Sequence, residues 1–213
     1  MRGVKWIFFD VGSTLVDEKR SYARWAQELL AGTDIPLAEF EARREALARA
    51  GTPGDSTLAA SFGLTAPPWP SGEEIVFPDA VSTLRTLRQR GYRLGIIANQ
   101  EPGLPARLDA RGLGEFLSVI LSSAEFGSAK PEPGIFEAAL RQANCRPEEA
   151  AMVGDRLDND IAPARKLGMR TVRILQGYGA LAQPRNAEET PDAQVHTLAE
   201  LLALFPPVMS QED

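Results

Sequence analysis

The sequence predicts an α/β protein, built on a parallel sheet with helices on both faces and carrying an inserted helical cap. Short apolar runs of strand length alternate along the chain with segments whose apolar residues recur at helical spacing, and this alternation is typical of βαβ units. Polar residues follow several of these runs, at the strand ends where open α/β sheets bind ligands. A helical segment ending in a Gly/Pro-rich stretch separates the first strand from the rest, which indicates the cap.

Composition describes an acidic globular protein and excludes several partners. The 213 residues, 44% of them hydrophobic, suffice for one good core and a small second module. The formal net charge of -6 and the pI near 5.0 argue against nucleic-acid and membrane partners, because phosphate-rich surfaces attract basic proteins. Cys145 is the only cysteine, which excludes an internal disulfide and fits a cytoplasmic location. The apolar run before Asp10 is too short for a signal segment or a membrane span.

The first strand ends in a carboxylate. The apolar run from Trp6 to Phe9 is followed by Asp10 and then by a Gly12-Ser13-Thr14 turn. A buried strand that ends in this way places Asp10 at the carboxyl edge of the sheet, where ligands bind. Asp is also common in turns that have no function, so this stretch alone favours a site residue and a turn cap about equally.

The cap is predicted from residues 16–77. Apolar residues recur at helical spacing from Tyr22 to Leu30 and again over residues 36–50, and Gly32 and Gly51 end these two helices. Residues 52–78 are rich in Gly, Pro and Ser, with one short helix expected around residues 58–62. We therefore expect a core domain of residues 1–15 and 78–213 and a helical cap domain of residues 16–77.

Beyond the cap, strands and helices alternate regularly. Asp79 and Asp160 stand where helix N-caps are expected, and Gly91 and Gly168 stand where those helices should end. The expected strands cover residues 94–98, 119–121, 151–153 and 171–174, and further helices are expected at 104–111, 134–142 and 198–204.

Polar residues from separate segments should meet at one edge of this sheet. Asp10, Asn99 and Asp155 each follow a strand, and Lys130 precedes a helix, so the topology brings them into one crevice. Two carboxylates and an ammonium group around a Gly-rich turn suit Mg²⁺ and a phosphate. Each residue has a structural alternative, because Lys130 could be a surface lysine and Asp155 a turn residue, but their contexts favour the site.

The ordered set of segments resembles the haloacid dehalogenase-like (HAD) superfamily over nearly the whole chain. The resemblance is carried by Asp10 to Thr14, by Ala98-Asn99, by Gly127 to Phe136 with Lys130, and by Val153 to Asp160 with Gly154-Asp155. The last two segments are the most specific. The resemblance implies a Rossmann-like core and a Mg²⁺-dependent phosphatase of a small phosphorylated molecule. The sequence is compatible with a monomer or a dimer.

The resemblance also implies roles for single residues. Asp10 would attack phosphorus and form an aspartyl-phosphate, and Mg²⁺ would be held by Asp10, the backbone carbonyl of Gly12 and Asp155. Lys130 would balance the charge. The phosphate would be bound by Lys130, by Asn99 and by backbone N–H groups of Gly12, Ser13 and Thr14. Asp160 would be a helix N-cap or would act on the metal through water.

Two positions depart from the superfamily pattern. Gly12 stands where the phosphatases have a second Asp, their general acid and base, and Ala98 stands where they have Ser or Thr. General acid–base catalysis typically contributes about 10² to 10⁴ in rate, so we expect a weak phosphatase unless Asp17 or Glu18, just past the turn, supplies the proton. Two alternatives stay open: a dehalogenase-like hydrolase that uses Asp10 on carbon without metal, and a non-catalytic descendant that keeps the phosphate pocket.

Overall fold

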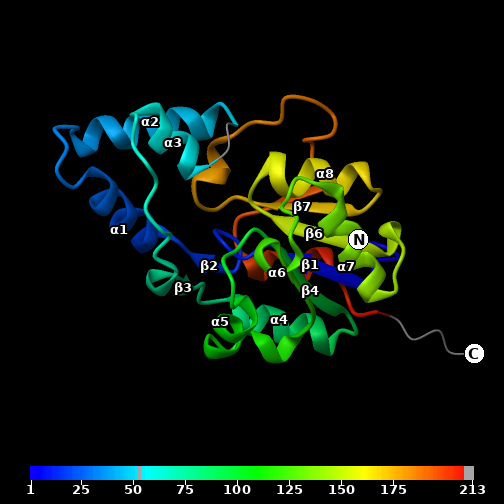
Figure 1. Ribbon diagram of the computed structural model, residues 1–213. Helices are drawn as coiled ribbons and strands as arrows, with labels where there is room; N and C mark the ends of the chain where they lie inside the picture. Colours follow the sequence, from blue (N-terminus) through cyan, green and yellow to red (C-terminus); the bar gives the residue numbers. More distant parts are fainter. Residues whose placement is uncertain (52–53, 209–213) are drawn as a thin grey trace, which may run out of the picture.

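A parallel sheet forms the centre of the molecule. The computed structural model describes residues 1–51 and 54–208, and within them six strands pair in the order β5-β4-β1-β6-β7-β8 (Figure 1). The strands are β1 (Trp6–Phe9), β4 (Arg93–Ala98), β5 (Leu117–Ser122), β6 (Ala150–Gly154), β7 (Arg170–Ile174) and β8 (Ala193–Val195). Every neighbouring pair is parallel, which confirms the predicted sheet.

Three short strands were missed by the sequence prediction. They are β8 at the sheet edge and the antiparallel pair β2 (Val16–Asp17) and β3 (Ile75–Val76). Each has only two or three residues, too few to show the alternation on which the prediction rests. The β2–β3 pair matters for the architecture, because it joins the two ends of the helical insert at one place beside the sheet.

Helices cover both faces of the sheet, as predicted. In β1, Ile7 and Phe9 join one apolar layer and Trp6 and Phe8 join the other, because successive strand side chains point to opposite faces. The first layer is covered by α4 (Ala80–Gln89), α5 (Leu104–Ala110) and α9 (Leu201–Leu204), and the second by α7 (Pro133–Ala143) and α8 (Ala162–Lys166). The one-turn helix α6 (Ser123–Phe126) follows β5. The other single helical turns are η1 (Ser71–Glu73), η2 (Gly114–Phe116), η3 (Pro147–Glu149), η4 (Leu157–Ile161), η5 (Tyr178–Leu181) and η6 (Leu198–Glu200).

The insert has an apolar cluster of its own. Its helices are α1 (Lys19–Leu30), α2 (Leu37–Arg49) and α3 (Asp55–Ser61), drawn in blue and cyan to one side of the sheet in Figure 1. Their buried residues form one cluster, separate from the two layers on the sheet: Trp25, Ala26, Leu29, Phe40, Leu58 and Ala59. The third helix begins three residues earlier than expected, and Thr52 and Pro53 lie outside the described residues. The separate cluster supports the proposed domain division, which remains a prediction.

Neither acidic N-cap prediction holds in detail. Asp79 does precede α4, but its carboxylate accepts a hydrogen bond from the backbone N–H of Ala199 at 2.9 Å, and none from its own helix. Asp160 lies inside the single turn η4, and α8 begins after Ile161. The preference of Asp for N-caps is a local rule, and here each carboxylate has a distant partner, Ala199 for Asp79 and Lys130 for Asp160. Asp160 also accepts a bond from the backbone N–H of Arg156 at 3.0 Å.

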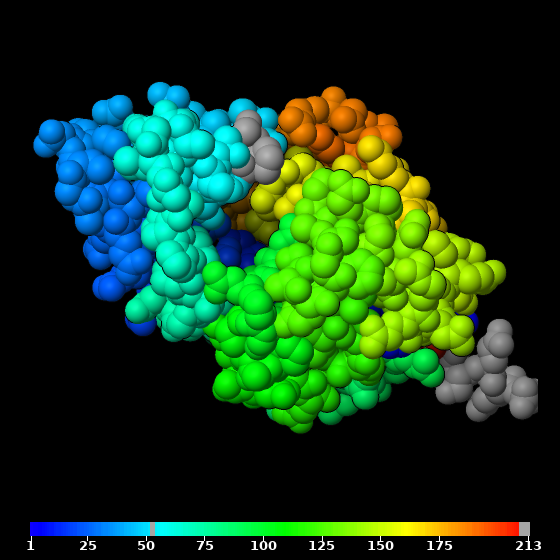
Figure 2. Space-filling view, viewed as in Figure 1, coloured from blue at the N-terminus to red at the C-terminus, as the bar shows by residue number. Residues whose placement is uncertain are grey.

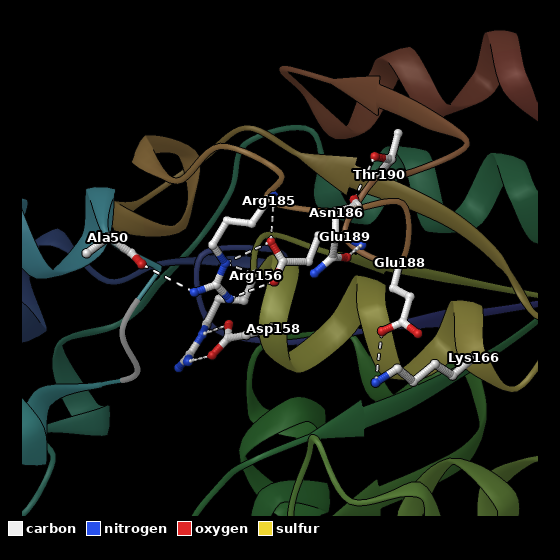
Figure 3. A network of polar contacts seen from close by, with 9 residues as sticks. All are labelled: Ala50, Arg156, Asp158, Lys166, Arg185, Asn186, Glu188, Glu189 and Thr190. Atoms are coloured by element: carbon white, nitrogen blue, oxygen red, sulfur yellow. Dashed lines mark hydrogen bonds and ion pairs between the residues drawn. The ribbon is translucent and has the colours of Figure 1, made fainter.

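The loop between β7 and β8 contacts both the insert and the core (Figure 3). Arg185 pairs with Glu189 at 2.6 Å and donates a hydrogen bond to the carbonyl of Ala50, at the end of α2, at 3.4 Å. On the core side, Lys166 of α8 pairs with Glu188 at 2.9 Å. None of the helices in the described part of the chain combines the length and the apolar character that a bilayer crossing requires.

Candidate active site

Lys130 lies between two carboxylates at the carboxyl edge of the sheet. Its Nζ is 2.6 Å from Oδ1 of Asp10, which follows β1, and 2.6 Å from Oδ1 of Asp160 in η4. Only 2% of the lysine side chain is exposed. Burial opposes the charge of Lys130, but the attraction of Asp10 and Asp160 outweighs it and raises the pKa of the ammonium group. The lysine is therefore held in its charged form.

Asn99 fixes the backbone that carries this lysine. Its Nδ2 donates to the carbonyl oxygen of Lys130 at 2.8 Å, and its Oδ1 accepts from the N–H of Lys130 at 2.7 Å. The sequence predicts that Asn99 binds substrate, whereas both ends of its amide here hold the Lys130 peptide. Because Asn99 follows β4, this pair of bonds ties the lysine segment to the sheet edge beside Asp10.

Three carboxylates converge on one point. Asp10, Asp155 and Asp160 each offer an oxygen, and these atoms all lie within 4.8 Å of one another. Burial, with the charges of Asp160 and Asp10 nearby, raises the pKa of Asp155, and burial raises the pKa of Asp160 to about 6. Concentrated, poorly compensated negative charge of this kind, made of oxygen ligands, fits a hard divalent cation such as Mg²⁺. The structure thus brings Asp10 and Asp155 together as expected and adds Asp160.

The turn after Asp10 differs from the expected phosphate cradle at Thr14, one of its three predicted N–H groups. The N–H of Thr14 donates to the carbonyl of Val11 at 3.2 Å, so this group is not free for a phosphate. Thr14 is fully buried, and among the described residues its hydroxyl has no hydrogen-bond partner. Ser13 adopts a left-handed conformation, with φ of 51°, and its Oγ donates to Oε2 of Glu18 at 2.7 Å. The hydroxyl groups of this turn are therefore directed at the protein itself.

Glu18 occupies the space next to Gly12. A Cβ added at Gly12 would lie 2.8 Å from Cδ of Glu18 and nearer still to Oε1. Desolvation raises the pKa of the Glu18 carboxyl to about 8, against the opposing hydrogen bond from Ser13. The carboxylate of the neighbouring Asp17 has another partner: it accepts a hydrogen bond from the N–H of Lys19 at the start of α1. Of the two acids next to the turn, Glu18 is the one that lies beside Asp10 in the same cavity.

That cavity opens between the insert and the strand ends. It has a volume of about 470 Å³, and its wall includes Asp10, Glu18, Asn99, Lys130 and Asp155. Tyr22, Trp25 and Trp69 form the aromatic side of the wall. Figure 2 shows the hollow between the cyan insert and the green and yellow core, with dark blue N-terminal atoms at its floor.

A second buried cation lies behind this wall, in the insert. Arg44 of α2 is 5% exposed and lies over the rings of Tyr22, Phe40 and Tyr178 at 5.0 to 5.2 Å. It also pairs with Glu41 at 3.1 Å. Tyr178 comes from η5 of the core, and its hydroxyl donates to Glu41 at 2.9 Å. This contact is not visible in the sequence pattern, because the partners are more than 130 residues apart.

The family follows from a comparison of the whole chain with known proteins. The family model described as haloacid dehalogenase-like hydrolase matches residues 4–168. The chain belongs to this family. The match confirms the resemblance drawn from the four motif segments, and it spans Asp10, Lys130, Asp155 and Asp160.

Relatives of this HAD-like chain include proteins named as phosphatases. A protein of Methanopyrus kandleri named glyceraldehyde 3-phosphate phosphatase is 40% identical over 130 residues, which cover 59% of the chain and 54% of that relative. The chain thus matches about half the length of this relative. One of the same name from Pyrococcus furiosus is 33% identical over 96% of the chain and 94% of its own length. The crystal structure of a HAD phosphatase from Thermococcus onnurineus, 24% identical, superposes with a TM-score of 0.66 over 96% of the chain and 99% of that protein, which supports the fold.

Proposed function

We propose that this HAD-like protein is a Mg²⁺-dependent phosphatase of small phosphorylated molecules. The observation that carries the proposal is the contact of Lys130 with Asp10 at 2.6 Å, in a cavity that Asp155 also lines. A lysine held in this way orients Asp10 as a nucleophile while it attracts the oxygens of a phosphate. The names of the relatives, glyceraldehyde 3-phosphate phosphatases among them, support phosphorylated metabolites as the substrate class.

In the proposed reaction Asp10 attacks phosphorus. The bond between phosphorus and the leaving oxygen breaks, and an aspartyl-phosphate forms on Asp10, which water then hydrolyses. Lys130 balances the negative charge of Asp10 and of the phosphoryl oxygens. Mg²⁺, when held by Asp10, Asp155 and the carbonyl of Gly12, would supply further positive charge at the phosphoryl oxygens.

The cavity limits the size of the substrate. A volume of about 470 Å³ is within the range of small-ligand sites, roughly 300 to 1,000 Å³. Its aromatic side, with Tyr22 and Trp69, belongs to the insert, so we infer that the insert selects the organic part of the substrate. A cytoplasmic location agrees with this class of substrate and remains a prediction.

The test is release of inorganic phosphate from a panel of phosphorylated metabolites and aryl phosphates, with Mg²⁺ and with EDTA. We expect release with Mg²⁺ only, and none from Asp10→Asn. Asp34→Asn, which changes an exposed carboxylate outside the cavity, should leave the rate unchanged. Release of halide from 2-haloacids in EDTA would instead favour the dehalogenase-like alternative, and no release from any substrate would favour the non-catalytic one.

A further inference from the structure

We propose that Glu18 is the proton donor and acceptor of this reaction, in place of the side chain that Gly12 lacks. The inference rests on the proposed phosphatase function and assigns one more catalytic residue to it. Its basis is spatial: the carboxylate of Glu18 lies where a side chain at position 12 would begin. A missing acid in the sequence is thus matched by a carboxylate at the same place in the structure.

The orientation of Glu18 is set by the turn before it. The left-handed conformation of Ser13 brings its Oγ to 2.7 Å from Oε2 of Glu18. Ser13 in turn packs against Gly177, where a Cβ would overlap the serine side chain. Ser13 holds Oε2, and Oε1 is the oxygen that lies nearer to the space beside Gly12. Glu18 and Asp10 line the same cavity.

The backbone also places Glu18 at this point. The carbonyl of Val11 accepts bonds from the N–H groups of Leu15 and Val16 at 2.8 and 3.1 Å, which folds the chain back beside Asp10. Glu18 then stands at the N-cap of α1, and its carbonyl accepts a bond from the N–H of Tyr22 at 2.8 Å. The residue is therefore fixed between the sheet and the insert and lines the cavity floor.

The polar contacts of Glu18 agree better with chemistry than with structural support. Over residues 1–51 and 54–208 the carboxylate forms no ion pair with Lys, Arg or His, and Ser13 is the side chain that donates to it. Glu18 is half-buried, and removing a carboxylate from water even in part, with no cation beside it, costs free energy. A Gln at position 18 would accept the same bond from Ser13, so the fold alone does not require an acid here.

In the proposed first step, Asp10 bonds to phosphorus as the bond to the leaving oxygen breaks, and the protonated Glu18 gives its proton to that oxygen. In the second step, water attacks the phosphorus of the aspartyl-phosphate and gives a proton to the Glu18 carboxylate. The bond between phosphorus and Asp10 then breaks, which releases phosphate. Asp10 and the protonated Glu18 are both restored, so one carboxyl group serves as acid and as base.

The experiment compares kcat/KM for phosphate esters whose leaving groups differ in pKa, from nitrophenyl to simple alkyl. Glu18→Gln keeps the shape and the Ser13 bond, and we expect it to lose about 10²- to 10⁴-fold on alkyl phosphates and much less on nitrophenyl phosphate, which leaves without a proton. Asp17→Asn is the matched control and should match the wild type. If wild-type protein is active and Glu18→Gln shows the same leaving-group dependence, the inference fails while the phosphatase function stands. If wild-type protein releases no phosphate at all, both fail.

A second pair of variants tests the place of the carboxyl group. Glu18→Ala removes the acid, and Gly12→Asp in the same chain returns one from the other side of the vacated space. We expect the double variant to recover at least tenfold over Glu18→Ala on alkyl phosphates. Circular dichroism and thermal unfolding check that both variants are folded. A folded double variant no faster than Glu18→Ala would overturn the equivalence of the two positions.

Discussion

The core and the insert each bury a cation, and they hold it in different ways. In the core, Lys130 lies 2.6 Å from two carboxylates whose positions follow from the backbone of β1 and η4. In the insert, Arg44 lies among aromatic rings 5.0 to 5.8 Å from its guanidinium carbon, with one partly exposed partner, Glu41. The first arrangement depends on charge pairing and the second mostly on packing.

This difference indicates that the catalytic groups of the core are held rigidly and that the substrate-facing wall of the insert is the part that can vary. Asp10 and Asp155 directly follow β1 and β6, which are hydrogen-bonded to each other, so the sheet fixes the separation of these two carboxylates. The aromatic wall belongs to the insert, which has its own apolar cluster, and we expect the insert to be able to shift as a unit. We expect substitutions in the core cluster to abolish function and substitutions in the insert to alter specificity.

The largest effect is expected from Lys130→Met. This change leaves the buried Asp160 and the half-buried Asp10 without their shared cation, and breaking a buried pair typically costs about 3 to 5 kcal/mol. We expect a loss of that size in the free energy of unfolding, measured by urea denaturation in EDTA. Lys166→Met removes an exposed pair with Glu188 and should cost less than about 1 kcal/mol. Equal costs for the two variants would contradict the charge-pairing account.

The next effect concerns Mg²⁺. A cation that binds only the folded state stabilises it by about 2.7 kcal/mol at a hundred times its Kd, so Mg²⁺ should raise the unfolding midpoint of the wild type. Asp155→Ala should remain folded and lose this response, because it removes one of the carboxylates of the cluster. Calorimetry should show the same loss of binding. Unchanged Mg²⁺ affinity in this variant would rule out Asp155 as a ligand.

A third prediction separates the two regions physically. Asp17 and Ile75 are paired across β2 and β3, so replacing residues 18–74 with an Asn-Gly turn should form a hairpin and leave a folded core. That core keeps Asp10, Lys130 and Asp155 but lacks Glu18. We expect it to hydrolyse nitrophenyl phosphate, to lose about 10²-fold or more on alkyl phosphates, and to discriminate poorly among substrates. If it does not fold, the proposed domain division is wrong.

The sequence predicted the core better than the insert for a physical reason. Asp10, Asn99 and Asp155 follow buried strands, and parallel topology brings strand ends together whatever the side chains do. The pairing of Lys130 with Asp160 was missed, because a local N-cap rule explained Asp160 equally well. The aromatic surroundings of Arg44 were missed entirely, since helical spacing shows which residues are apolar but not which distant ring they meet.

Position 12 shows the same limit of local reasoning. Its glycine is visible in the sequence as a lost acid, and Glu18 and Asp17 were equal candidates to replace it. Only the left-handed turn at Ser13 and the bond to Glu18 distinguish them. The sequence does contain a signal for this arrangement: Glu18 directly precedes the first helix of the insert, and from there its side chain can fold back to the Gly12-Ser13 turn.

The smallest effect tests the contact between the two regions at Arg44 and Tyr178. The guanidinium lies 5.2 Å from the ring of Tyr178, and the tyrosine hydroxyl donates to Glu41. Arg44→Met keeps the apolar volume, so we expect a loss of roughly 1 kcal/mol, the scale of a partly buried cation–π contact. A double-mutant cycle with Tyr178→Leu should give a coupling free energy of at least about 0.5 kcal/mol, measured by urea unfolding. Arg49→Met, which removes an exposed pair with Glu45, should show no coupling to Tyr178→Leu. A coupling free energy of zero for Arg44 and Tyr178 would mean that this contact does not stabilise the packing of the insert on the core. The insert would then be held by the β2–β3 pair and by the contact of Arg185 with Ala50 instead.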